Sequence, residues 1–127
     1  MKTILVDAIN GLVLENGNIL ASMHDLLETY PNRKIVLTGA NDEQLKQFNL
    51  DQVPYEVFTL KHNPEKTDPE YFRILLEKYG LTVKDVVYFE HNRDAVESAR
   101  SLGINTYFYD HTKEDMVSLK QFLDQNL

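Results

Sequence analysis

The sequence predicts an α/β fold, in which helices pack on a parallel β-sheet. Short apolar runs alternate along the chain with segments of helical periodicity. This alternation is typical of parallel strands that are joined by helical crossovers. The first apolar run, residues 3–8 (TILVDA), lacks the polar–apolar alternation of a half-exposed strand. A continuous apolar run of this length favours a strand that is buried on both faces.

The first half of the chain is predicted to contain three strands, two helices and a hairpin. The strands are residues 3–8, 34–38 and 55–60. The helices are residues 22–30 and 41–48, with Ser22 and Asn41 as candidate N-caps. Residues 11–20 (GLVLENGNIL) place Asn16-Gly17 between two apolar stretches, a pair typical of a type I′ turn. We therefore expect a β-hairpin directly after the first strand.

The second half continues the alternation. The remaining strands are predicted at residues 85–90 and 104–110, and the helices at residues 68–80, 93–102 and 113–125. The helix at 68–80 has signals at both ends, because Asp68 can cap it, Pro69 occupies its first turn and Gly80 follows its last residue.

Composition narrows the possible functions. A chain of 127 residues predicts one domain, residues 1–127. Its net charge of −7 gives no electrostatic basis for binding nucleic acid or an acidic membrane surface. The absence of cysteine excludes disulfides, thiolate metal sites and cysteine nucleophiles. Residues 1–10 are typical of neither a signal peptide nor a membrane span, so we expect a cytoplasmic protein.

Polar side chains follow the strands that are predicted to lie side by side. Asp7 ends the first strand, Thr38 ends the second, and Glu90 ends the fourth. Gly39 and His91 directly follow two of them. Ligands of open parallel sheets bind beyond the carboxyl ends of the strands, so these residues are candidates for one site.

The loop after the third strand adds Lys61 and Lys66 to this set. The combination suits phosphoryl chemistry. A carboxylate can attack phosphorus to form an acyl phosphate. A second carboxylate can help to hold Mg²⁺, while a hydroxyl, backbone N–H groups and a lysine stabilise the charge on the transferring group.

Each residue also has a purely structural interpretation. Asp7 can be a loop-facing acid, Thr38 and Gly39 can form a turn, and Lys66 can be a solvated surface lysine. Glu90 can stabilise the N-terminus of the following helix, and His91 can be a polar loop residue. The other histidines form no recognisable constellation in the sequence: His24, His62 and His111. Only the joint arrangement favours a functional site.

The order of these residues resembles the haloacid dehalogenase-like (HAD) superfamily, whose members are mostly phosphatases. The likeness covers nearly the whole chain and is strongest in residues 66–104, beginning KTDPE and including the acidic strand end FEHN. This stretch is similar to the phosphoglycolate phosphatase and β-phosphoglucomutase-like branch. The resemblance implies a Rossmann-like three-layer α/β/α sandwich with strand order 3-2-1-4-5. It also implies that the hairpin after the first strand is a flap over the site.

The resemblance also implies roles for individual residues. Asp7 would be the nucleophile, Thr38 and Gly39 would bind phosphate, and Lys66 would neutralise charge. Mg²⁺ would be held by the carboxylates of Asp7 and Glu90 together with one backbone carbonyl, that of Ile9.

Two positions depart from the phosphatase pattern. A second aspartate usually stands two residues after the nucleophile and transfers protons, but here that residue is Ile9. Since acid–base catalysis contributes about 10²–10⁴ in rate, we expect slow turnover. At the fourth strand Glu90 and His91 stand where two acids are common, so a weak Mg²⁺ site is expected.

The chain has no room for a cap domain on either side of Thr38. Residues 6–10 (VDAIN) are also similar to the haloacid dehalogenases, but those enzymes enclose small acids under a cap. The expected function is therefore a capless, Mg²⁺-dependent phosphomonoesterase whose phosphorylated substrate can be macromolecular. The alternative is a degenerate domain that binds a ligand or a protein without turnover. A response-regulator receiver domain fits less well, because no aspartate ends the third strand. The sequence makes no prediction of oligomeric state.

Overall fold

The computed structural model describes residues 1–127 and contains one five-stranded parallel sheet. The strands follow the order β3-β2-β1-β4-β5, as predicted. They are β1 (Thr3–Asp7), β2 (Lys34–Thr38), β3 (Glu56–Thr59), β4 (Val86–Glu90) and β5 (Asn105–Phe108). All five residues of β1 and of β4 are buried, which explains their continuous apolar sequences.

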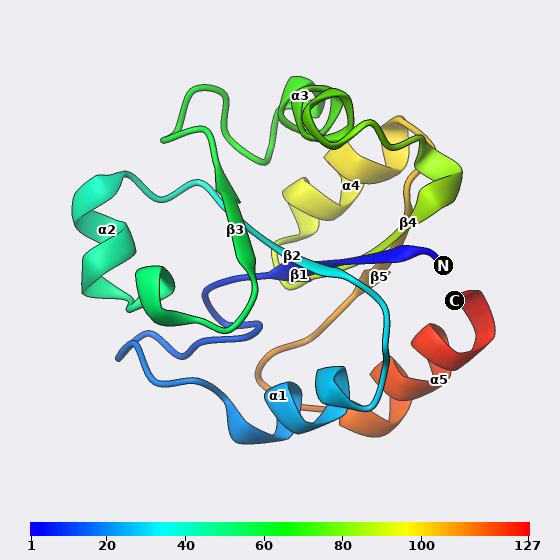
Figure 1. Cartoon of the computed structure of the whole chain (residues 1–127), viewed down its shortest axis with the longest axis horizontal. Helices are drawn as coiled ribbons and strands as arrows, with labels where there is room; N and C mark the ends of the chain where they lie inside the picture. The colour runs from blue at the N-terminus through cyan, green and yellow to red at the C-terminus, as the bar shows by residue number, and fades with distance from the viewer.

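Helices cover both faces of this sheet (Figure 1). They are α1 (Ala21–Glu28), α2 (Asp42–Gln47), α3 (Pro69–Tyr79), α4 (Arg93–Ser101) and α5 (Met116–Asn126). In Figure 1, α3 and α4 lie above the sheet, α1 and α5 lie below it, and α2 flanks the sheet near β3. The predicted three-layer α/β/α sandwich is therefore confirmed.

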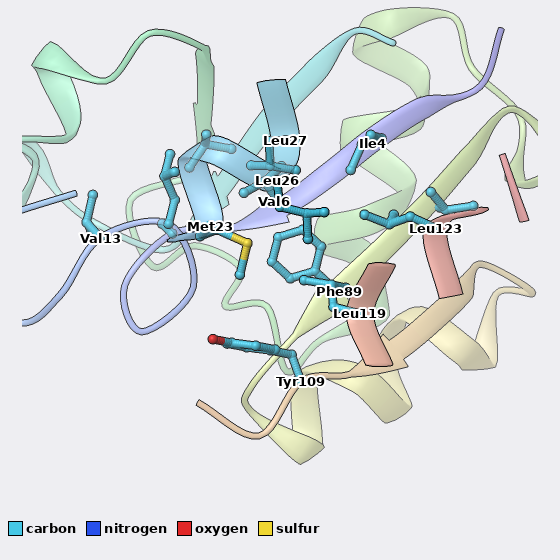
Figure 2. Close-up of a cluster of buried hydrophobic side chains, with 14 of the residues drawn as sticks. Ile4, Val6, Val13, Met23, Leu26, Leu27, Phe89, Tyr109, Leu119 and Leu123 are labelled. Carbon is cyan, nitrogen blue, oxygen red and sulfur yellow. The ribbon is translucent and has the colours of Figure 1, made fainter. Parts of the chain in front are cut away.

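The core on the side of α1 and α5 contains 16 buried residues. Figure 2 shows Met23 of α1 beside the ring of Phe89 of β4, with Leu119 of α5 nearby. Burying a large apolar side chain stabilises the fold by about 1.5–3 kcal/mol. Val13, from the segment between β1 and α1, is also fully buried in this core. Apolar packing therefore holds this part of the segment against the sheet.

A second core of 11 buried residues lies between the sheet and the helices α3 and α4. Tyr71 and Phe72 of α3 are fully buried there. The Tyr71 hydroxyl donates to the backbone oxygen of Thr38 at 2.7 Å, across the layers. This contact ties α3 to the end of β2, where the candidate site begins.

Most helix termini follow the sequence signals. Asn41 caps α2 in a capping box, and Asp68 caps α3, which ends at Gly80 in the left-handed conformation. The cap expected at Ser22 was wrong. Helix α1 begins one residue earlier, with Leu20 at its N-cap position and no side-chain cap.

The segment after β1 reverses direction as predicted, but its turn differs from the expected type I′. The Gly17 N–H donates to the Leu14 oxygen at 2.9 Å, and the Leu14 N–H donates to the Asn18 oxygen at 2.8 Å. Of Asn16 and Gly17, only Gly17 has a positive φ (+85°), whereas a type I′ turn requires a positive φ at both residues. The reversal is thus a three-residue loop with glycine at its left-handed position. One isolated bridge, between Val13 and Ile19, joins its two arms in place of regular strands.

The strand order also distinguishes this fold from the receiver alternative. Flavodoxin-like receivers have the order 2-1-3-4-5, whereas β1 here lies between β2 and β4. No helix combines the length and apolar character that a membrane span requires.

Candidate active site

Residues at the ends of β1, β2 and β4, together with the loop between β3 and α3, line one pocket of about 180 Å³ at the carboxyl edge of the sheet. Val6 of β1 pairs with Phe89 of β4, so Asp7 and Glu90 come next on neighbouring strands. Lys66 reaches them from the loop between β3 and α3. The pocket is lined by Asp7, Ile9, Thr38, Gly39, Ala40, Gln44, His62, Glu65, Lys66, Glu90, His91 and Asn92. All six residues expected to form the site are among these twelve.

The carboxylate of Asp7 lies at the bottom of this pocket and is almost fully buried. Its Oδ1 accepts a hydrogen bond from Lys66 Nζ at 3.0 Å. Its Oδ2 accepts one from the backbone N–H of His91 at 3.0 Å and is also bonded to Nδ1 of the His91 ring. Both oxygens therefore have donors within the protein.

Glu90 is fully buried beside Asp7 and shares two of its neighbours. Lys66 Nζ lies 2.6 Å from Glu90 Oε1, and the Tyr88 hydroxyl donates to the same oxygen. Glu90 Oε2 accepts from the Asn92 N–H at 3.0 Å and lies 3.2 Å from His91 Nδ1. Lys66 and the His91 ring each bridge the two carboxylates. We refer to Asp7, Lys66, Glu90 and His91 as the floor of the pocket.

The floor places two carboxylates beside an ammonium and an imidazole. Burial and the charges of these neighbours together set the direction of each pKa shift. Burial and the charge of Glu90 raise the pKa of Asp7 above its ordinary value, despite the opposing effect of Lys66. Burial opposes ionisation of Glu90, but the ammonium of Lys66 outweighs it and lowers the pKa of Glu90. Burial also opposes charge on His91, yet hydrogen bonds to Asp7 and Glu90 raise the pKa of His91 to about 10.

The same floor contains the oxygen donors that a divalent cation needs. Ligand atoms of Asp7, Glu90 and His91 lie within 4.8 Å of one another. Ile9 lines the pocket, and its carbonyl accepts no hydrogen bond within the chain. Two carboxylates and a carbonyl fit Mg²⁺ in chemical type. The His91 ring, however, lies against both carboxylates and competes for the same oxygens, so the donor set fits a weak site.

The turn after β2 presents two groups that can bind an anion. Thr38 Oγ1 accepts from the Ala40 N–H at 3.1 Å, which leaves its own O–H free to donate. The Gly39 N–H makes no hydrogen bond within the chain. Both residues line the pocket beside Lys66.

A tight turn after β1 fixes the backbone of Asp7. The Leu12 N–H donates to the backbone oxygen of Asp7 at 2.9 Å, and Asn10 has a φ of +65°. A Cβ atom at Gly11 would lie 2.3 Å from that Asp7 oxygen, so only glycine fits there. The residue at the position of the usual second acid, Ile9, borders the pocket with a side chain that cannot transfer a proton.

Three further polar residues form the opening of the pocket, and sequence analysis found none of them. His62 Nδ1 lies 2.7 Å from Glu65 Oε1, and His62 Nε2 lies 2.6 Å from Gln44 Oε1. The side chains of His62 and Glu65 are 40% and 52% exposed, in contrast to the buried floor. We refer to Gln44, His62 and Glu65 as the mouth of the pocket. The expectation that His62 joins no constellation was wrong.

The other polar residues considered from the sequence lie outside the pocket. Lys61 forms an exposed ion pair with Asp42 at 3.1 Å. His24 lies near Tyr55, with 6.1 Å between their ring centroids. The His111 ring packs edge-on against that of His91, at a centroid distance of 4.9 Å. His111 thereby supports a floor residue without lining the cavity.

Comparison with known proteins identifies the class of fold. Neither a protein-family model nor a curated protein sequence matches the chain. Solved structures do match. A HAD-family enzyme from Bacteroides thetaiotaomicron, in complex with magnesium and inorganic phosphate, superposes with a TM-score of 0.65 at 23% identity. That match covers 80% of this chain and 58% of the enzyme.

Two other solved structures share the fold. The core domain of a candidate phosphoglycolate phosphatase from Streptococcus pneumoniae gives a TM-score of 0.63 at 18% identity, covering 97% of this chain and 95% of that domain. The UTR4 protein of Saccharomyces cerevisiae gives 0.57 at 15% identity, covering 71% of this chain and 47% of the yeast protein. The chain thus spans about half of the longer structures. It has an α/β Rossmann-like fold, which it shares with these solved structures.

Proposed function

We propose that the protein is a HAD-like hydrolase, a slow Mg²⁺-dependent phosphomonoesterase with Asp7 as nucleophile. The observation that carries this proposal is the convergence of Asp7, Thr38, Lys66 and Glu90 on one pocket. The similarity to HAD-family structures supports the hydrolase class. The contact of Lys66 Nζ with both carboxylates supports it further, because this charge neutralises the site as a phosphate enters.

In the proposed first step, an Asp7 oxygen attacks phosphorus and the bond to the leaving oxygen breaks. The product is a phosphoaspartate, which water then hydrolyses to regenerate the carboxylate. The Thr38 hydroxyl and the Gly39 N–H would bind the oxygens of the phosphoryl group. Lys66 would oppose the effect of burial and of Glu90 on Asp7, since an ammonium at 3.0 Å favours the charged form of the carboxylate.

Mg²⁺, where bound, would be held by the Asp7 and Glu90 carboxylates and the Ile9 carbonyl, and it would neutralise charge on the phosphoryl oxygens. His91 must withdraw its ring from these carboxylates for the ion to be accommodated. This competition is the physical reason to propose weak binding. Ile9 cannot make the acid–base contribution of about 10²–10⁴ that an aspartate makes at this position, so turnover is slow to the extent that no other residue replaces it.

We further propose a capless architecture, with residues 1–127 forming one domain. Only residues 8–20 separate β1 from α1, and residues 60–68 separate β3 from α3. Such short connections leave the mouth open to solvent. A large phosphorylated substrate, such as a phosphoprotein, would itself exclude water from the reacting groups. The net charge of −7 argues against nucleic acid and membrane partners.

Turnover of 2,4-dinitrophenyl phosphate with Mg²⁺ tests the proposal. We expect measurable hydrolysis by the wild type and none above background for Asp7→Asn, because an amide cannot attack phosphorus as a carboxylate does. Folding of the variant is checked by circular dichroism. Equal rates for the two proteins would exclude Asp7 as the nucleophile.

A degenerate binding domain is the second candidate, and the closed hydrogen bonding of the floor favours it. Every carboxylate oxygen of Asp7 and Glu90 already has a donor within the protein. Calorimetry with inorganic phosphate separates the two candidates. Phosphate binding without Asp7-dependent turnover of any aryl phosphate would support the binding domain.

A further inference from the structure

The mouth residues form a connected group at the opening of the pocket. His62 stands between Glu65, from its own loop, and Gln44, from α2, with its two ring nitrogens directed at one oxygen of each. All three residues line the same pocket as Asp7 and Thr38. None of them takes part in the phosphoryl chemistry proposed above, so this group requires a separate explanation.

The two atoms that face the ring nitrogens of His62 are both hydrogen-bond acceptors. Gln44 Oε1 also accepts from the Asn41 N–H at 3.0 Å, and this contact identifies the oxygen side of the Gln44 amide. Glu65 Oε1 is a carboxylate oxygen, which only accepts. Both nitrogens of His62 therefore face acceptors, so each can donate a hydrogen bond when it carries a hydrogen. This geometry places a proton-carrying group at the mouth of the pocket.

The backbone holds His62 in this place at some conformational cost. Lys61 and His62 have φ values of +53° and +65°, which non-glycine residues seldom adopt. Strain of this kind persists where surrounding contacts enforce it, and it is found most often at functional sites. A Cβ atom on Gly39 would lie 3.3 Å from His62 Nδ1 and 3.1 Å from Glu65 Oε2. The imidazole thus packs over the turn that presents Thr38 and Gly39.

We propose that His62 is the general acid and base of this site, in place of the acid that Ile9 lacks; this inference rests on the proposed phosphomonoesterase function. As the Asp7 oxygen bonds to phosphorus and the ester P–O bond breaks, the leaving oxygen takes a proton from His62. In the second step a water attacks the phosphoaspartate and gives a proton to neutral His62. The P–O bond to Asp7 breaks, and the products are the alcohol and inorganic phosphate.

The neighbours of the ring have distinct parts in this proposal. Glu65 is a positioning residue, because its carboxylate orients the imidazole through Nδ1. Gln44 Oε1 occupies the acceptor position at Nε2. A leaving oxygen that replaces this amide oxygen would receive the proton along the same direction.

The dependence of rate on the leaving group tests the assignment. Phenolate is a poor leaving group that needs a proton, whereas 2,4-dinitrophenolate leaves without one. We therefore expect His62→Gln to lower kcat/KM for phenyl phosphate by about 10²–10³ and for 2,4-dinitrophenyl phosphate by less than about tenfold. Glu65→Gln should show the same selectivity with a smaller loss.

His24→Gln is the matched control, because His24 lies outside the pocket and should leave both rates unchanged. Equal losses for the two substrates in His62→Gln, or no loss, would overturn the role of His62. The proposed function is judged separately, by Asp7-dependent turnover of 2,4-dinitrophenyl phosphate, which needs no acid. If that turnover is missing in the wild type, both proposals fail. A misfolded His62→Gln would leave Glu65→Gln to decide, and an unselective effect there would count against the assignment.

Discussion

The floor and the mouth of the pocket are built from similar charged residues but differ in burial. On the floor, Asp7 and Glu90 are fully buried, and Lys66 is only 16% exposed. At the mouth, His62 and Glu65 keep about half of their side-chain surface in solvent. Removing one buried partner leaves the other charge without compensation, whereas water replaces a lost partner at the mouth.

This difference separates two tasks within one site. The buried carboxylates of the floor and Lys66 cannot lose one another without a large cost in free energy, so they are suited to holding a nucleophile in one position. The mouth can exchange a protein partner for a substrate atom at small cost. Stability measurements should therefore distinguish the two regions independently of any assay of activity.

The largest expected effect is that of Lys66→Met. This substitution keeps most of the apolar stem but removes the ammonium that bridges Asp7 and Glu90. Two buried carboxylates then repel each other, and the free energy of unfolding at pH 7 should fall by about 3–5 kcal/mol. Urea denaturation measures it.

Lys120→Met is the control for this measurement. Lys120 pairs with Asp124 at 2.6 Å on the exposed surface of α5, so its loss should cost no more than about 0.5 kcal/mol. Similar losses of unfolding free energy for the two variants would show that Lys66 contributes no more to stability than an exposed ion pair does.

An intermediate effect, dependent on pH, is expected for His91→Gln. The pKa of His91 is raised from 6.5 to about 10 in the folded protein. A raised pKa means that the stabilisation from the charged ring is complete below pH 6.5 and is lost as the pH rises through 10. In EDTA, the difference in unfolding free energy between wild type and variant should therefore be largest near pH 6 and shrink toward pH 10. A difference that is constant, or that grows with pH, would contradict the ion pairs of the floor.

The smallest effect on stability is expected at the mouth. Glu65→Gln removes the charge that faces His62 but retains a hydrogen-bonding side chain of the same shape. Because both partners are largely exposed, the free energy of unfolding should change by less than about 1 kcal/mol. Thermal and urea denaturation at pH 7 measure it. A loss as large as that of Lys66→Met would remove the contrast between floor and mouth.

The positions of the floor residues could be predicted because parallel strands bring their carboxyl ends to one edge. Asp7, Thr38 and Glu90 each end a buried apolar run, and that pattern is visible in the sequence. The loop after the third strand brought both Lys61 and Lys66 to the same edge, and the resemblance to a family selected Lys66. Helix N-termini with side-chain caps, such as Asn41, could be predicted from the sequence equally well.

The mouth could not be predicted for the opposite reason. The location of His62 depends on two consecutive residues with positive φ, and neither is a glycine that would have marked the turn. Its partner Gln44 comes from another element, and no local pattern links the two. The contact between the His91 ring and Asp7 was missed similarly, because a side chain's orientation within a loop depends on tertiary neighbours. The predicted cap at Ser22 failed because α1 already includes Ala21, which places Ser22 inside the first turn of the helix.

One feature of α2 connects the architecture to whatever enters the pocket. A single oxygen, Gln44 Oε1, both caps the helix at Asn41 and faces the imidazole of His62. A molecule that recruits this oxygen, or displaces it, would free the Asn41 amide at the same moment. Hydrogen–deuterium exchange at the Asn41 amide would then report whether a molecule occupies the pocket. The N-terminus of α2 would respond to binding without any added probe.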